Sequence, residues 1–176
     1  MWARPQGGAV TRLSVAIRPP SRVCDVLRRL PREPASRVNW SAPGQWLVTL
    51  RPLGHVPEHV TGPLVDVLAA ELAGAGPVRC VLGPVTRRIG GQWLGAPVAG
   101  LDELADVVFA ATEPLVPVTH PQPFQADVVL ARGRVPAALA GQPVAAEWTA
   151  GTVELLADRS APGRPRFDQL AAFPLA

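Results

Sequence analysis

Apolar and polar residues recur with two different periods along the chain, and these periods divide it into predicted strands and helices. Short runs rich in β-branched and aromatic residues predict strands, and apolar residues three or four positions apart predict helices. Strands are predicted at 13–17, 46–50, 78–82, 126–131, 152–157 and 167–173, with shorter extended pieces at 38–40, 92–94 and 97–98. Helices are predicted at 21–30, at about 58–73 and from near residue 101.

Turn residues separate these elements. Ser21 is expected to cap the first helix and Pro31 to break it, while Gly54 and Gly74 are expected to end the strand at 46–50 and the second helix. The order is strand, helix, strand, helix, strand pair, helix, strand and a final strand pair. This mixture of strands, helices and hairpins predicts an α+β fold.

The composition indicates a globular protein. Of 176 residues, 48% are apolar, which is enough to bury a core in a chain of ordinary domain size. Residues 1–176 are therefore expected to form a single domain, with a disordered N-terminal segment at 1–11. No apolar run approaches the roughly 20 residues of a membrane span, and the first residues lack the apolar centre of a signal peptide. A soluble, cytoplasmic protein is expected, with Cys24 and Cys80 as reduced core thiols.

Charge is segregated along the sequence. All seventeen basic residues are arginines, against fourteen acidic residues. Residues 1–55 hold nine arginines and two acids, whereas residues 56–127 hold three arginines and eight acids. The basic first segment is compatible with RNA or an acidic protein as a partner, but an ordinary solvated surface is the favoured interpretation.

Two stretches of the chain carry a family resemblance. Val38-Asn39-Trp40, Pro43 and the run at 46–54, Trp-Leu-Val-Thr-Leu-Arg-Pro-Leu-Gly, resemble the first motif of the bacterial RNA 2',3'-cyclic phosphodiesterases, also called 2'-5' RNA ligases. In that family the motif contains Trp, Pro, His-x-Thr-Leu and Leu-Gly. The run at 123–132, Pro-Phe-Gln-Ala-Asp-Val-Val-Leu-Ala-Arg, resembles the second motif, Phe-Arg-Pro-His-x-Thr-Leu-Ala-Arg. The opening Arg-Leu-Ser-Val-Ala-Ile at 12–17 and the closing Ala-Ala-Phe-Pro-Leu at 171–175 are also similar to the family's.

The resemblance implies the 2H phosphoesterase fold: two pseudo-symmetric lobes of antiparallel sheet, with helices outside and a cleft lined by the two motif strands. The motif positions that carry His, Thr, His and Thr in the active family carry Leu47, Thr49, Asp127 and Val129 here. Since side chains alternate along a strand, 47 and 49 are expected to share a face, as are 127 and 129. No catalytic residue is assigned at these positions, because a leucine cannot transfer a proton and a carboxylate repels phosphate.

The three histidines lie outside the motif positions. His55 and His59 follow the first motif, and His120 precedes the second in a proline-rich loop. None is expected on the strand face that lines the cleft, so surface or loop-packing roles are favoured. A loop histidine acting with Asp127 remains an alternative, because imidazole transfers protons near neutral pH.

Arginines and tryptophans beside the motifs are the candidate ligand contacts. Arg51, Arg132 and Arg134 flank the motif strands and can bind phosphate through two nitrogens, or can be solvated strand ends. Trp46 is expected to face away from Leu47 and pack in the core. Trp40, a candidate substrate contact, and Trp93 can stack on a nucleobase or pack in hairpins.

These features give one leading hypothesis and two alternatives. The first is a divergent 2',3'-cyclic phosphodiesterase-like protein that is catalytically inactive and binds a nucleotide or a phosphate-bearing RNA end. The second is an active phosphodiesterase that uses Asp127 and a loop histidine on an unusual substrate. The third is an RNA- or protein-interaction module that uses the basic N-terminal segment. No metal and no cofactor is expected, since no ligand cluster or phosphate-binding glycine motif is visible; a monomer is the default.

Overall fold

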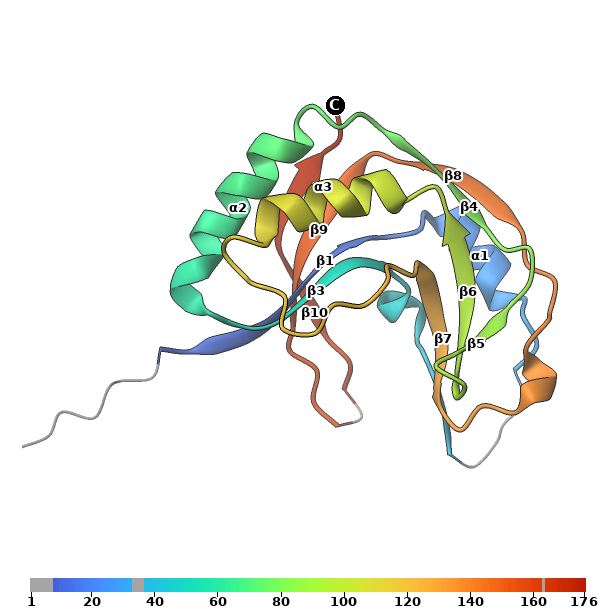
Figure 1. The fold of residues 1–176 in the computed structure, drawn as a ribbon. Helices are drawn as coiled ribbons and strands as arrows, with labels where there is room; N and C mark the ends of the chain where they lie inside the picture. The colour runs from blue at the N-terminus through green and yellow to red at the C-terminus, as the bar shows by residue number, and fades with distance from the viewer. Residues whose placement is uncertain (1–7, 33–36, 163) are drawn as a thin grey trace, which may run out of the picture.

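The structure is a computed structural model that describes residues 8–32, 37–162 and 164–176. Its described strands form one curled antiparallel sheet in the order β10-β9-β1-β3-β7-β6-β4-β8, with β2 paired to β7 and β5 paired to β6 (Figure 1). The strands are β1 (Val10–Ile17), β2 (Val38–Trp40), β3 (Val48–Pro57), β4 (Val78–Leu82), β5 (Arg87–Ile89), β6 (Trp93–Ala99), β7 (Asp127–Gly133), β8 (Ala146–Ala150), β9 (Thr152–Asp158) and β10 (Phe167–Pro174).

The sheet divides into two lobes. Strands β10, β9, β1 and β3, here the first lobe, are backed by the helices α2 (Glu58–Leu72) and α3 (Asp102–Thr112). The remaining strands form the second lobe, and α1 (Ser21–Arg28) packs against its strand β8. The lobes join where β3 and β7 meet, through the pair Val48 and Val128. Among the described residues, no helix is long and apolar enough to cross a membrane.

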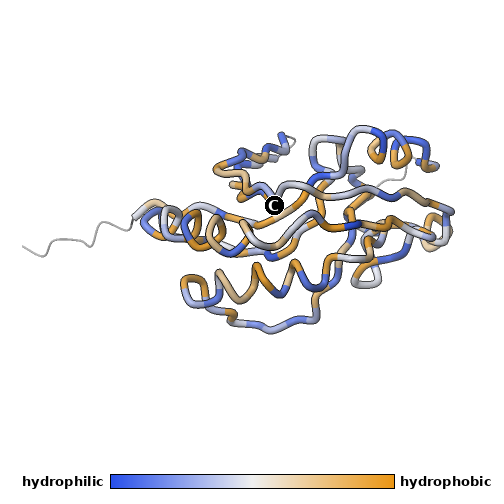
Figure 2. Tube along the Cα trace, turned by 90° about the horizontal axis from the view of Figure 1, so that it is seen from above, coloured by the Kyte–Doolittle hydropathy of each residue, from blue (hydrophilic) through white to orange (hydrophobic). Residues whose placement is uncertain are grey.

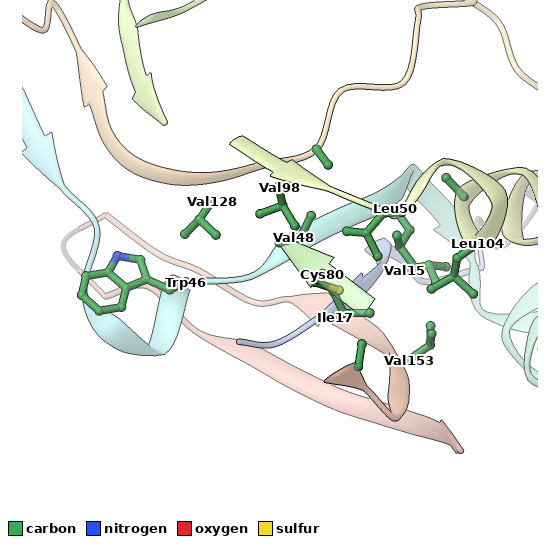
Figure 3. Close-up of a cluster of buried hydrophobic side chains, with 14 of the residues drawn as sticks. Val15, Ile17, Trp46, Val48, Leu50, Cys80, Val98, Leu104, Val128 and Val153 are labelled. Carbon is green, nitrogen blue, oxygen red and sulfur yellow. The ribbon is translucent and has the colours of Figure 1, made fainter. Parts of the chain in front are cut away.

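The distribution of apolar residues explains why these segments pack as they do. Hydrophobic positions recur along the strands and along the helices (Figure 2), and β9 is buried at five successive positions. Val48 and Val128 project from the joining strands into the main core, where Val98 and Leu50 meet them (Figure 3). Burying a side chain of this size contributes about 1.5–3 kcal/mol. Packing of Val48 and Val128 in the core therefore holds β3 and β7 in place, and the motif positions lie on the opposite face of these two strands.

The prediction of an α+β fold is confirmed, and several boundaries are corrected. The predicted strand at 78–82 coincides with β4, whereas the strands β5 and β8 were missed. Strand β3 does not end at Gly54 but continues to Pro57, because Gly54 adopts a positive φ of 70° and lets the strand run on. Of the predicted disordered segment, residues 1–7 lie outside the described residues, and Val10 and Thr11 belong to β1.

Candidate functional site

The four motif positions lie together on one face of the sheet, here called the motif face. Ala16 of β1 pairs with Thr49 of β3, and Val48 pairs with Val128 of β7. Thr49 and Asp127 are therefore opposite each other across the junction of the lobes, since they flank that pair. Leu47 and Val129 are adjacent to them on the same face, because alternate residues of a strand point the same way.

Leu47 is fixed in an apolar cluster on the motif face. Its side chain packs with Ala16 and Leu156, and Phe167 lies against the group. Leu47 is only 9% exposed, so its position offers no polar atom and little contact with solvent. Trp46 points to the opposite face and belongs to the main core (Figure 3). The orientation predicted for Trp46 is confirmed.

Asp127 is held by an arginine of the neighbouring hairpin. The Nε of Arg87 donates to Oδ1 of Asp127 at 2.9 Å, and its Nη2 donates to Oδ2 at 2.8 Å. The Asp127 side chain is 6% exposed, whereas that of Arg87 is 45% exposed. These hydrogen bonds raise the pKa of the Arg87 guanidinium. The carboxylate is thus paired through both oxygens, which occupies the atoms that a general base would use.

A second ion pair lies on the motif face of the first lobe. Glu154 of β9 pairs in register with Ala16, so it shares the face of Thr49. Its Oε2 accepts a hydrogen bond of 2.8 Å from Nε of Arg18. Asp127 and Glu154, the two carboxylates of this part of the face, are therefore each compensated by a guanidinium group.

His55 lies on the motif face, which corrects the expectation that no histidine does so. It pairs in register with Arg12 of β1, and Arg12 pairs with Asp158 of β9. Arg12 is four residues from Ala16 along β1, which corresponds to about 13 Å. His55 therefore belongs to a separate row at the end of the face, beyond hydrogen-bonding reach of an atom held at Thr49.

The charged row beside His55 is coupled to the second lobe. Burial alone raises the pKa of Asp158, but hydrogen bonds from Ser160 and the charges of Arg12 and Arg132 outweigh it, so this pKa lies below its ordinary value. Arg132 belongs to β7. Guanidinium groups from both lobes thus act on one carboxylate at this end of the motif face.

His59 forms a His-x-Thr string with Val60 and Thr61, but it does not form a strand motif. The string begins at the second residue of α2. Residues two apart in a helix point in nearly opposite directions, whereas those in a strand share a face. His120 lies in the segment between α3 and β7, outside any helix or strand.

Comparison with solved structures places this arrangement in a known fold. E. coli LigT complexed with 3'-AMP superposes with a TM-score of 0.82 at 19% identity, over 96% of this chain and 99% of that one. The protein TT0787 of Thermus thermophilus gives 0.80 at 24% identity, over 93% and 97%. A structure described as a phosphoesterase gives 0.78 at 20% identity, over 94% and 99%. The chain has the LigT-like 2H phosphoesterase fold. No protein-family model and no curated protein matches it.

The LigT-like fold does not bring Arg51 to the motif face, which corrects its prediction as a ligand contact. Arg51 pairs in register with Val15, a core residue, and is 7% exposed. Its Nη1 donates to Oγ1 of Thr112 at 2.6 Å and its Nη2 donates to the carbonyl of Val116. Burial lowers the pKa of the Arg51 guanidinium. Arg51 therefore ties β3 to the helix α3 and the residues after it.

The prediction of Trp40 as a substrate contact is also corrected, because Trp40 packs against the main core with Trp46 and Leu130. Its ring lies against the main core, under the guanidinium of Arg32 at 5.8 Å. Trp93 does reach the motif face, since it pairs with Ile89 of β5, whose side chain covers the motif-face side of Gly95. Trp93 is 40% exposed.

The remaining arginines lie at the edge of the second lobe. The guanidinium of Arg132 lies 5.2 Å from the centroid of the Trp93 ring, and Arg134 is exposed just beyond β7. These positions are compatible with the predicted phosphate contacts. Arg87 is the residue that sequence reasoning missed, because its strand is three residues long and its pairing with Asp127 depends on the tertiary fold.

Two hollows of the described residues lie beside α1 and not at the motif positions. One is a cavity of about 10 Å³ lined by residues that include Leu27, Trp46 and Thr86. The other is an open groove of about 300 Å³ that includes Arg29, Pro84 and Pro143. Neither hollow includes a motif position, so the candidate site is defined by the side chains on the motif face.

Proposed function

We propose that this protein is a divergent member of the 2H phosphoesterase superfamily that binds a nucleotide or a phosphate-bearing RNA end and does not catalyse phosphodiester hydrolysis. The fold supports the superfamily assignment. Structures of E. coli LigT with this fold contain 3'-AMP, ATP, NADP+ or phosphate. Ligands of this class contain phosphate, and most contain an adenine base.

The observation that carries the proposal is the state of the two positions that the family resemblance assigns to histidine. Leu47 is packed among Ala16, Leu156 and Phe167, and it has no group that exchanges a proton. Asp127 is bound through both oxygens by Arg87. Since a general acid or base contributes on the order of 10²- to 10⁴-fold to a rate, loss of both removes most of the catalytic advantage.

Binding is supported by groups that remain on and around the motif face. Thr49 keeps a hydroxyl there, and the Trp93 ring lies with Arg132 at its edge. Aromatic rings stack on unpaired bases and guanidinium groups bind phosphate. The two helices behind the first lobe carry six acidic residues and no arginine. Negative charge is thus kept on the helical side, so a polyanion is favoured to approach from the sheet side.

The test combines hydrolysis and binding. The parent protein is incubated with 2',3'-cyclic AMP and with short RNAs that end in a 2',3'-cyclic phosphate, beside a Leu47→His, Asp127→His double variant. Binding of 3'-AMP is measured by titration calorimetry. We expect the parent to bind 3'-AMP without turnover and the double variant to gain measurable hydrolysis.

Other outcomes separate the alternatives. Turnover by the parent that disappears in Asp127→Ala would establish the active phosphodiesterase that uses Asp127 and a loop histidine. Absence of 3'-AMP binding, with salt-sensitive binding of long RNA instead, would favour an interaction module that uses the basic first segment. Either result contradicts the proposed function.

A further inference from the structure

We propose that Arg87 and Thr49 form a phosphate-binding site at the junction of the lobes, in which Asp127 holds Arg87 in place. This inference rests on the proposed function, because it assigns the atoms that recognise the phosphate group. It gives Asp127 the role of a positioning residue and gives Arg87, from the short strand β5, the direct contact with the ligand.

The register of the strands brings the three side chains together. Thr49 and Asp127 flank the Val48 and Val128 pair from opposite sides of the junction, and residues directly opposite in an antiparallel pair have Cβ atoms about 4.5–5.5 Å apart. The Arg87 guanidinium lies 2.8–2.9 Å from both oxygens of Asp127. The hydroxyl of Thr49 and the guanidinium therefore lie on either side of one carboxylate.

The guanidinium retains capacity for a ligand. Its bonds to Asp127 use Nε and Nη2, and Nη1 takes no part in them. The Arg87 side chain is half exposed while the carboxylate beneath it is buried. An arginine held in this way presents a planar donor edge to solvent, and phosphate oxygens match that edge. A phosphate bound there would also be within reach of the Thr49 hydroxyl.

Packing around Gly95 fixes the strand that carries Arg87. Arg87 pairs in register with Gly95 of β6, and Gly95 pairs with Val129 of β7. A Cβ atom on Gly95 would lie 2.2 Å from Cδ1 of Ile89 and 3.2 Å from Cβ of Asp127. Because Gly95 has no side chain, Ile89 can pack directly on β6. This packing holds β5 beside the second motif strand, with Arg87 against Asp127.

The charge of this site is balanced within the chain. Asp127 cancels the charge of Arg87, so removing Arg87 alone would leave a buried carboxylate that repels phosphate. A neutral pair, Arg87→Gln with the isosteric Asp127→Asn, removes both charges and leaves the net charge unchanged. Comparing the single and double variants therefore separates a direct contact by Arg87 from simple neutralisation of Asp127.

The experiment measures binding of inorganic phosphate and of 3'-AMP by calorimetry, with folding checked by thermal unfolding. Since a hydrogen bond to a charged group contributes about 1.5–3 kcal/mol, we expect Arg87→Gln to weaken phosphate binding on the order of 10- to 100-fold. The double variant should stay at least about fivefold weaker than the parent, and Thr49→Val should be about three- to tenfold weaker. Arg79→Gln and Thr149→Val are matched controls on β4 and β8, where Arg79 pairs with Glu147, and should bind as the parent does.

The outcomes distinguish this inference from the function on which it rests. If the parent binds 3'-AMP but the Arg87→Gln, Asp127→Asn variant binds phosphate as tightly as the parent, Arg87 makes no direct contact and the inference alone fails. If the parent binds neither phosphate nor 3'-AMP at millimolar concentration, the proposed function fails and the site fails with it.

Discussion

Replacement of Arg51 tests the orientation of the strand that carries the first motif. Arg51→Ala removes the donors to Thr112 and Val116 and the guanidinium that lies 5.1 Å from the Phe109 ring centroid. The hydroxyl of Thr112 remains bonded to the carbonyl of Val108, so the largest loss falls on the Val116 carbonyl. Hydrogen bonds to a charged group contribute about 1.5–3 kcal/mol each and an exposed cation–π contact about 0.5–1 kcal/mol.

We therefore expect Arg51→Ala to lower the free energy of unfolding by about 3 kcal/mol. Arg51→Met should lower it by about 2 kcal/mol, because methionine keeps the aliphatic packing. For a chain of this length the Ala variant should melt about 6–12 °C below the parent. The affinity of the folded variant for 3'-AMP should not change, because Arg51 lies on the core face.

Urea and thermal unfolding followed by circular dichroism measure the stability, and Arg134→Ala is the control on an exposed arginine beside the other motif strand. An Arg51→Ala variant as stable as the parent, or one that loses 3'-AMP affinity while fully folded, would refute the assignment of Arg51 to the core face.

Three further changes test the site and its surroundings. Trp93→Ala should weaken 3'-AMP binding by about 1–3 kcal/mol through loss of stacking, and should leave binding of inorganic phosphate unchanged; equal losses for both ligands would contradict a stacking role. Gly95→Ala should destabilise the protein by about 1–2 kcal/mol through overpacking, and adding Ile89→Val should restore part of that loss in urea unfolding because it removes the clashing methyl group. Burial raises the pKa of the Cys80 thiol from 9.0 to about 11, so its thiolate fraction below pH 9 falls about 100-fold; iodoacetamide should modify the half-buried Cys24 first, and peptide mass spectrometry showing the reverse order would contradict the burial of Cys80.

The sequence predicted most elements of the fold because their apolar periods are long enough to read. The predicted strand at 78–82 coincides with β4, and the second helix differs from α2 by one residue at its end. Strand β5 was missed because its three residues include two exposed arginines and only one partly buried residue. Such a strand is defined by its pairing with β6, which no local pattern contains.

The error at Arg51 has a physical cause in the irregular pairing of β3, whereas His55 was misplaced because the strand was expected to end at Gly54. Simple alternation would place 49, 51, 53 and 55 on one face. Register shifts in the pairing with β1 leave Leu50 and Leu53 without a partner, so Arg51 turns to the core and His55 returns to the motif face. A β-bulge of this kind adds one residue and reverses the faces that follow. The motif positions lie before the first bulge, which is why their shared face could be predicted.

The position of β1 within the sheet also bears on how the protein is made. This strand begins at Val10, yet it lies between β3 and β9, and its partners in β9 start at Glu154. On the ribosome, β1 and β3 can pair early, but one edge of β1 stays open until β9 emerges, more than 130 residues after β1. An open strand edge is a template for pairing with other chains. A nascent or prematurely terminated chain that ends before β9 would therefore be prone to aggregate, although every residue of both motifs has already been synthesised.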